Sequence, residues 1–133
     1  MRPVSRVAMA AALMLSALSM LAHNVYELPL SPFDPQNAGP IAFAAMLGVA
    51  YAVWPDSKAV AAAALGWGVL NLVIGGVVTV LPLSILPFMP EQSITHYAAH
   101  VVYAVGQVPL VAVSYRALRA TTATPEAPST RHG

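Results

Sequence analysis

Cysteine is absent from this sequence and charge is nearly so. Only 8% of the 133 residues are Asp, Glu, Lys or Arg, whereas a soluble domain carries about 25%. Without cysteine the chain can form no disulfide, no thiolate metal site and no cysteine nucleophile. The hydrophobic residues make up 58% of the chain, which places it outside the class of soluble domains.

Common enzyme motifs are also missing from the sequence. It has no Walker phosphate loop, no dinucleotide fingerprint and no G-x-S-x-G nucleophile elbow. Its serines show no paired base and acid at a recognisable spacing. We therefore expect no enzyme of the usual hydrolytic or transfer types.

The sequence instead contains four long stretches without charged residues. Apart from histidine, no charged residue occurs in residues 7–26, 35–55, 59–90 and 92–115, which are stretches of 20, 21, 32 and 24 residues. A helix needs about 20 apolar residues to cross a bilayer, and lipid offers no water to an unpaired backbone amide. We therefore predict an all-α integral membrane protein with a bundle of four transmembrane helices.

The four helices have approximate bounds from this pattern. Within a transmembrane domain of residues 1–119, the spans cover about 4–26, 38–54, 59–81 and 91–118. The second is the shortest, because Pro40 and Pro55 leave only about 17 residues between the loops.

The first segment also resembles a signal peptide. It has a basic start, an apolar run, and Ala17 and Ser19 in a possible cleavage pattern. The apolar run continues through Val25 and Tyr26, and further spans follow it. We expect a retained helix, with a cleaved signal as the alternative.

The basic residues predict the orientation. With four spans, every Lys and Arg falls on one side of the membrane, and the positive-inside rule makes that side the cytoplasm. Both termini are then cytoplasmic in a multi-pass protein of the cell membrane, and Glu27, Asp34 and Glu91 face outward. Because topology accounts for the basic residues, we expect no nucleic-acid partner. The six basic residues are Arg2, Arg6, Lys58, Arg116, Arg119 and Arg131.

The connections between spans have distinct compositions. "WPDSKA" predicts a tight turn, with Asp56 or Ser57 capping the third helix. Residues 120–133 are polar, aperiodic and rich in Thr and Pro, so we predict a disordered cytoplasmic tail in which His132 is incidental.

The two outer loops are apolar and similar to each other. "LPLSPFDP" from Leu28 matches "LPLSILPFMP" from Leu81 when two residues are inserted, and "FAAM" at Phe43 aligns with "YAAH" at Tyr97. A period near 54 residues would make the protein two duplicated helical hairpins. We expect these loops to lie in the headgroup region, and a lid over an outward-facing site is the alternative.

The third span carries a face of small and polar residues. Small residues let helices approach closely in lipid, so this face should pack against another helix. Asn71 and Tyr103 lie at similar depths, and we predict a hydrogen bond between them, with Gln107 one turn deeper. The face consists of Ala64, Gly68, Asn71, Gly75 and Thr79.

"HYAAHVVYAVGQ" places His96, His100, Tyr103 and Gln107 on one stripe of the fourth span. Two histidines at i and i+4 can bind a metal, and His23 or Glu91 could supply a third ligand for zinc, copper or haem iron. H-x-x-x-H alone is a weak motif. We expect His100 to form hydrogen bonds between helices, with metal or haem ligation and proton-linked chemistry as alternatives.

Residues 65–110 resemble small, uncharacterised multi-pass membrane proteins of high-GC actinobacteria. The resemblance is carried by the proline-rich loop and by "EQSITHYAAHVVYA". It implies a bacterial inner-membrane location and transfers no catalytic residue.

Three functions remain open from the sequence. We expect a non-enzymatic accessory or structural subunit that needs no cofactor and contacts lipid, a membrane-protein partner or further copies of itself. The first alternative is a haem- or metal-binding redox protein that uses His96, His100 and His23. The second is a small oligomeric transporter or channel lined by Asn71, Tyr103 and Gln107.

Overall fold

The computed structural model describes residues 4–28 and 30–122, and its regular elements within that part of the chain are all helices. The all-α prediction is confirmed. The elements in chain order are α1 (Arg6–Glu27), α2 (Pro35–Val53), α3 (Lys58–Leu70), the π-helical turn η1 (Asn71–Gly75), the 3-10 turn η2 (Val78–Val80) and α4 (Ile94–Thr122).

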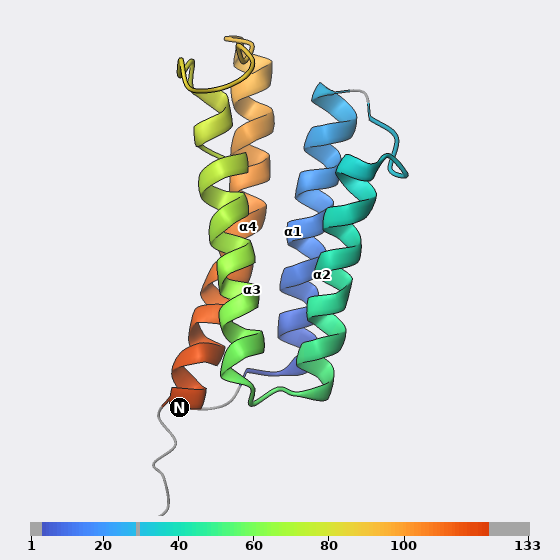
Figure 1. Cartoon of the computed structure of the whole chain (residues 1–133), viewed down its shortest axis with the longest axis vertical. Coiled ribbons are helices and arrows are strands. Elements are labelled where there is room, and N and C mark those ends of the chain that lie inside the picture. Colours follow the sequence, from blue (N-terminus) through green and yellow to red (C-terminus); the bar gives the residue numbers. More distant parts are fainter. Residues whose placement is uncertain (1–3, 29, 123–133) are drawn as a thin grey trace, which may run out of the picture.

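The four α-helices run side by side, and successive helices point in opposite directions (Figure 1). Helix α4 packs against α1 and α3, and α2 packs against the other side of α1 and also touches α3. Of the described helices, three are long and apolar enough to cross a membrane: Arg6–Glu27, Lys58–Val80 and Ile94–Thr122. Helix α2, the shortest predicted span, is not among them.

Serine caps set the start of α1 and α3. The Ser5 hydroxyl accepts a hydrogen bond from the Ala8 amide at 3.1 Å, and the Ser57 hydroxyl accepts one from the Val60 amide at 3.3 Å. Each satisfies a backbone donor that the first helical turn leaves free. Of the two predicted caps for the third helix, Ser57 and not Asp56 is the one used.

The third span is not one continuous α-helix, which corrects the predicted helix over residues 59–81. The chain widens into η1, where the Gly76 amide bonds the Asn71 carbonyl at 2.9 Å, five residues back. In the same turn the Asn71 side chain donates to the Trp67 carbonyl at 2.8 Å. Single π-turns of this kind inside α-helices are frequent at functional sites.

The fourth helix is displaced toward the C-terminus relative to the predicted span of 91–118. It begins at Ile94 and continues to Thr122, so residues 120–122 of the predicted disordered tail are helical. Arg119 lies in the last turn, where a cation is favoured, and donates to the Tyr115 hydroxyl at 3.2 Å. The remainder of the predicted tail, including His132, lies outside the described residues.

The core of the bundle changes character along its length. The half that contains the α2–α3 turn encloses a continuous apolar cluster, and the other half encloses polar side chains of α1, η1 and α4. The apolar cluster holds the helices mainly by close packing, with added hydrogen bonds from the Tyr51 hydroxyl to the Val4 carbonyl and from the Ser114 hydroxyl to the Met9 sulfur. Its buried members are Met9, Ala12, Leu13, Ala44, Leu47, Tyr51, Ala61, Ala64, Leu110 and Ala117.

Glycines on the predicted small face bring the third span against α4. A Cβ at Gly68 would lie 3.1 Å from Val111, and one at Gly75 would overlap the Tyr103 ring. Val69 and Val73, on the opposite face, are 41% and 45% exposed. The prediction that the small face meets another helix is confirmed at these positions.

We expect Gly75→Leu to destabilise the protein, because the new side chain would occupy the volume of the Tyr103 ring. Overpacking of this kind costs about 1–3 kcal/mol. The matched control is Gly66→Leu, since a Cβ at Gly66 meets no atom within 4 Å, and the expected change there is within about 0.5 kcal/mol. Thermal unfolding in detergent measures both, and equal losses would contradict the packing of this face.

Candidate functional site

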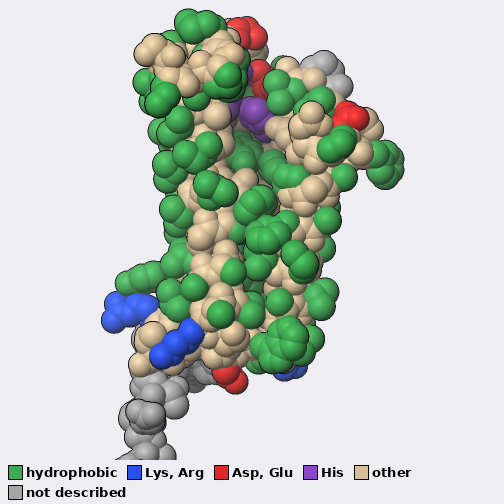
Figure 2. All heavy atoms as spheres, in the orientation of Figure 1, with side chains coloured by type: hydrophobic (Ala, Val, Ile, Leu, Met, Phe, Trp, Pro, Cys, Tyr) green, Lys and Arg blue, Asp and Glu red, His purple; other side chains and the backbone are tan. Residues whose placement is uncertain are grey.

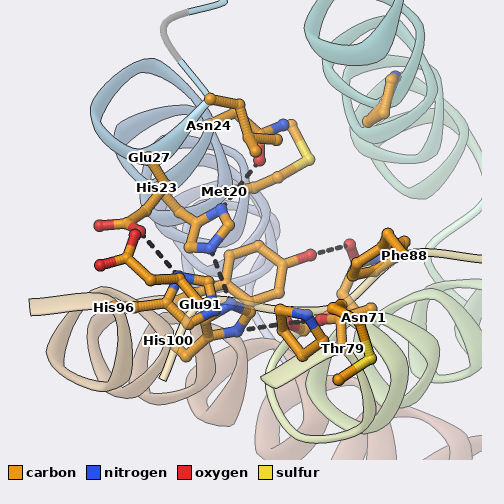
Figure 3. A pocket seen from close by; sticks show the side chains of 16 residues that line it. Met20, His23, Asn24, Glu27, Asn71, Thr79, Phe88, Glu91, His96 and His100 are labelled. Atoms are coloured by element: carbon orange, nitrogen blue, oxygen red, sulfur yellow. Dashed lines mark hydrogen bonds and ion pairs between the residues drawn. The ribbon is translucent and has the colours of Figure 1, made fainter. Parts of the chain in front are cut away.

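The two ends of the bundle carry different charges. Lys and Arg side chains gather at the end where α1 begins and α4 ends, with Asp56 of the α2–α3 turn beside them, whereas the described histidines and the other described acidic side chains gather at the opposite end (Figure 2). At this second end a pocket of about 480 Å³ opens between α1, η1 and α4. Its polar lining includes His23, His96, His100, Glu27 and Glu91 (Figure 3).

Helix α4 forms one wall of the polar interior with the four side chains predicted to share one face. His96, His100, Tyr103 and Gln107 are 9%, 4%, 5% and 0% exposed, so all four face the interior. The spacing of four, three and four residues that suggested a common face is confirmed.

The opposing wall comes from α1, and of its members only His23 is among the residues predicted to form a site. Ser16, Ser19, His23 and Glu27 follow one another at steps of three, four and four, so they share a face that meets the stripe of α4. Their periodicity is a usable signal in the sequence. The resemblance of the same segment to a signal peptide obscures it.

His100 lies at the centre of the cluster. Its Nδ1 is 2.9 Å from the Gly75 carbonyl oxygen, and its Nε2 is 3.1 Å from Nε2 of His23. A carbonyl oxygen can only accept, so His100 Nδ1 carries a proton. The contact joins α1, η1 and α4 through one imidazole.

Hydrogen bonds through two asparagines show which ring nitrogen of His23 carries a proton. Asn37 Nδ2 donates to the Ser31 carbonyl at 2.9 Å, so Asn37 Oδ1 accepts from Asn24 Nδ2 at 2.8 Å. Asn24 Oδ1 is therefore the acceptor for His23 Nδ1 at 3.0 Å. His23 Nδ1 must carry a proton, as His100 Nδ1 does.

His96 pairs with an acid of α1. Its Nδ1 lies 2.7 Å from Glu27 Oε2, and the two side chains are 11% and 9% exposed. Its Nε2 is the one buried side-chain polar atom without a hydrogen-bond partner within residues 4–28 and 30–122. The His96 and His100 ring centroids are 4.5 Å apart.

The deeper polar groups are paired between helices. Tyr103 donates to Asn71 Oδ1 at 2.6 Å, which confirms the predicted pair. Gln107 Nε2 donates to the Ser16 carbonyl at 3.2 Å and to the Ser19 hydroxyl at 3.1 Å, and the Ser16 hydroxyl donates back to Gln107 Oε1. These bonds replace the water that the interior lacks.

The apolar loop before α4 forms part of the outer wall of the pocket. Phe88, Met89 and Pro90 line it, although Phe88 and Met89 are still 48% and 77% exposed. Phe33 of the other outer loop is 89% exposed and is not part of the lining. The second loop thus partly covers the histidines.

In the part of the chain that the structure describes, no group of three or more His, Asp or Glu side chains is already assembled for a metal ion. No family model, curated protein or solved structure matches the chain. A functional proposal for this protein therefore depends on the geometry of the outer pocket.

We expect Tyr103→Phe to destabilise the protein by about 0.6 kcal/mol, the average for a hydrogen bond between membrane helices, and by no more than about 1.7 kcal/mol, the largest such value. The loss follows because Asn71 Oδ1 would keep no donor from α4. Tyr97→Phe is the matched control, since the Tyr97 hydroxyl also bonds an amide oxygen at 2.6 Å but is exposed. Unfolding in detergent should show a smaller effect for Tyr97, and the reverse order would contradict the role of the buried pair.

Proposed function

We propose that the chain is a multi-pass protein of the cell membrane with four spans and both termini in the cytoplasm. The gathering of Lys and Arg side chains at one end of the bundle supports this orientation. Helix α2 supports the fourth span, because it packs on α1 and α3 and its 19 residues would extend about 28 Å, close to the thickness of the hydrocarbon core.

The role that the geometry supports best is that of a non-enzymatic accessory subunit, which contributes an outward-facing histidine pocket to a membrane assembly. The observation that carries this proposal is the position of the polar side chains, which are bonded between helices inside the bundle and gather around a pocket at its outer end. Asn71, Tyr103 and Gln107 bond to neighbouring helices, and the histidines and acids of the outer end surround a pocket whose inner lining also includes Asn71 and Tyr103. Apolar side chains such as Val101, Val105 and Val108 cover the outer surface of α4, where lipid or a partner would lie.

The positions of the same polar side chains argue against one alternative function and for the other. A channel lined by Asn71, Tyr103 and Gln107 would require these side chains to give up their present partners, so we do not favour it. The metal-binding alternative gains support from the geometry of the histidines. The two duplicated hairpins remain a prediction.

The topology can be tested with reporter fusions. Fusions after Ser57 and after Arg119 should report cytoplasm, and a fusion after Asp34 should report the outside, because all basic residues then lie on one side. A cytoplasmic signal at Asp34 would contradict the four-span model. A mature protein that lacks the first segment would have three spans.

The accessory role predicts that the protein is part of a larger assembly in its own membrane. After mild solubilisation it should migrate on a native gel above the position of the purified chain in the same detergent. Co-migration with the purified monomer would argue against an accessory subunit.

A further inference from the structure

The three pocket histidines share one hydrogen-bonding arrangement. Each ring directs Nδ1 to an oxygen, namely Asn24 Oδ1 for His23, Gly75 O for His100 and Glu27 Oε2 for His96. An imidazole that donates from Nδ1 presents a lone pair at Nε2 in its neutral form. Histidines that bind metals are nearly always held through the other ring nitrogen in this way.

The contact between His23 and His100 requires a cation. Their Nε2 atoms are 3.1 Å apart while both Nδ1 atoms are committed to acceptors, so two neutral rings would oppose two lone pairs. Either an additional proton or a metal ion would remove this repulsion. Two nitrogens bound tetrahedrally to zinc at about 2.0–2.1 Å are roughly 3.3 Å apart, which is close to the observed separation.

We propose that the pocket binds a zinc-like divalent transition-metal ion through Nε2 of His23 and Nε2 of His100, with Nε2 of His96 as the third ligand. His96 qualifies because its Nε2 is buried without a partner and its ring adjoins that of His100. No set of three ligands is assembled within the described residues. The site is therefore completed when the His96 side chain reorients and brings its Nε2 to the bound metal.

The chemistry of the donors selects the class of metal. Three imidazole nitrogens suit zinc and its neighbours, whereas magnesium and calcium prefer oxygen ligands. Haem is a poorer fit, because ligands on opposite faces of its iron would be roughly 4 Å apart, about two metal–nitrogen bonds. Three protein ligands would leave a fourth position open to the pocket of about 480 Å³.

This inference rests on the proposed function, since it names the ligand of the outward-facing pocket. Failure of the metal test would leave the reporter-fusion and native-gel results unchanged, so the two proposals can fail separately.

The test uses the full chain purified in detergent without a histidine tag and freed of metal with a chelator. Calorimetric titration with Zn²⁺ should give one equivalent bound, and Co²⁺ should give the visible bands of a tetrahedral nitrogen site. Mg²⁺ should not bind. Absence of Zn²⁺ binding, or Mg²⁺ binding of equal strength, would overturn the proposal.

Single substitutions identify the ligands. His23→Gln, His96→Gln and His100→Gln should each weaken Zn²⁺ binding at least tenfold, because an amide is a poor ligand for zinc. His132→Gln and Tyr97→Phe are controls that should bind as the unmodified chain does. Unchanged binding in any of the three glutamine variants would overturn the three-histidine site.

Two further measurements do not depend on recovering those variants. Glu27→Gln keeps every proposed ligand but weakens the anchor of His96, and loss of such an anchor lowers metal affinity about 10–100-fold. X-ray absorption of the zinc-loaded unmodified chain should show imidazole nitrogens at about 2.0–2.1 Å. Unaltered affinity in Glu27→Gln, or coordination by oxygen alone, would contradict the three-histidine site.

Discussion

A polar group inside a lipid-embedded bundle has no water to bond with, so it must find its partner on a neighbouring helix. Helix α4 shows how far this constraint shapes the protein. Gln107 is bonded to serines of α1, Tyr103 to Asn71, and His100 to both His23 and the Gly75 carbonyl. Because each bond joins two elements, these bonds fix the register of the polar half of the bundle.

The π-turn η1 links helix packing to the histidine cluster. Gly75 has no side chain, which leaves room for the Tyr103 ring, and its carbonyl oxygen accepts from both His100 Nδ1 and the Thr79 hydroxyl. In a regular α-helix that carbonyl would be used by the amide four residues later. The interruption of the helix therefore supplies the acceptor that orients His100, and a residue chosen for close packing also positions the candidate site.

The sequence predicted those features that depend on periodicity and depth. The stripe from His96 to Gln107 follows from helical spacing, and the Asn71–Tyr103 bond follows from counting residues inward from the outer loops. It could not predict η1, because the widened turn depends on how the Tyr103 ring meets Gly75. Nor could it predict that Asn24 and Asn37 bond to each other, since that contact depends on how the α1–α2 connection folds back. The predicted end of α4 is too early because a polar composition indicates disorder, although Arg119 can stabilise a last turn.

Helix packing and ligand binding are not competing roles for these histidines. The bonds from Nδ1 to Gly75 and Glu27 join neighbouring elements, and in the neutral rings the same bonds leave the lone pair at Nε2. A histidine used only for packing would be expected to bond through both nitrogens, as buried polar groups generally do. His96 is bonded through one nitrogen, and the Nε2 atoms of His23 and His100 face each other. Helix packing alone accounts for the hydrogen bonds that the histidines make through Nδ1. The unpaired Nε2 of His96 and the close approach of the Nε2 atoms of His23 and His100 are explained once a cation is bound between them.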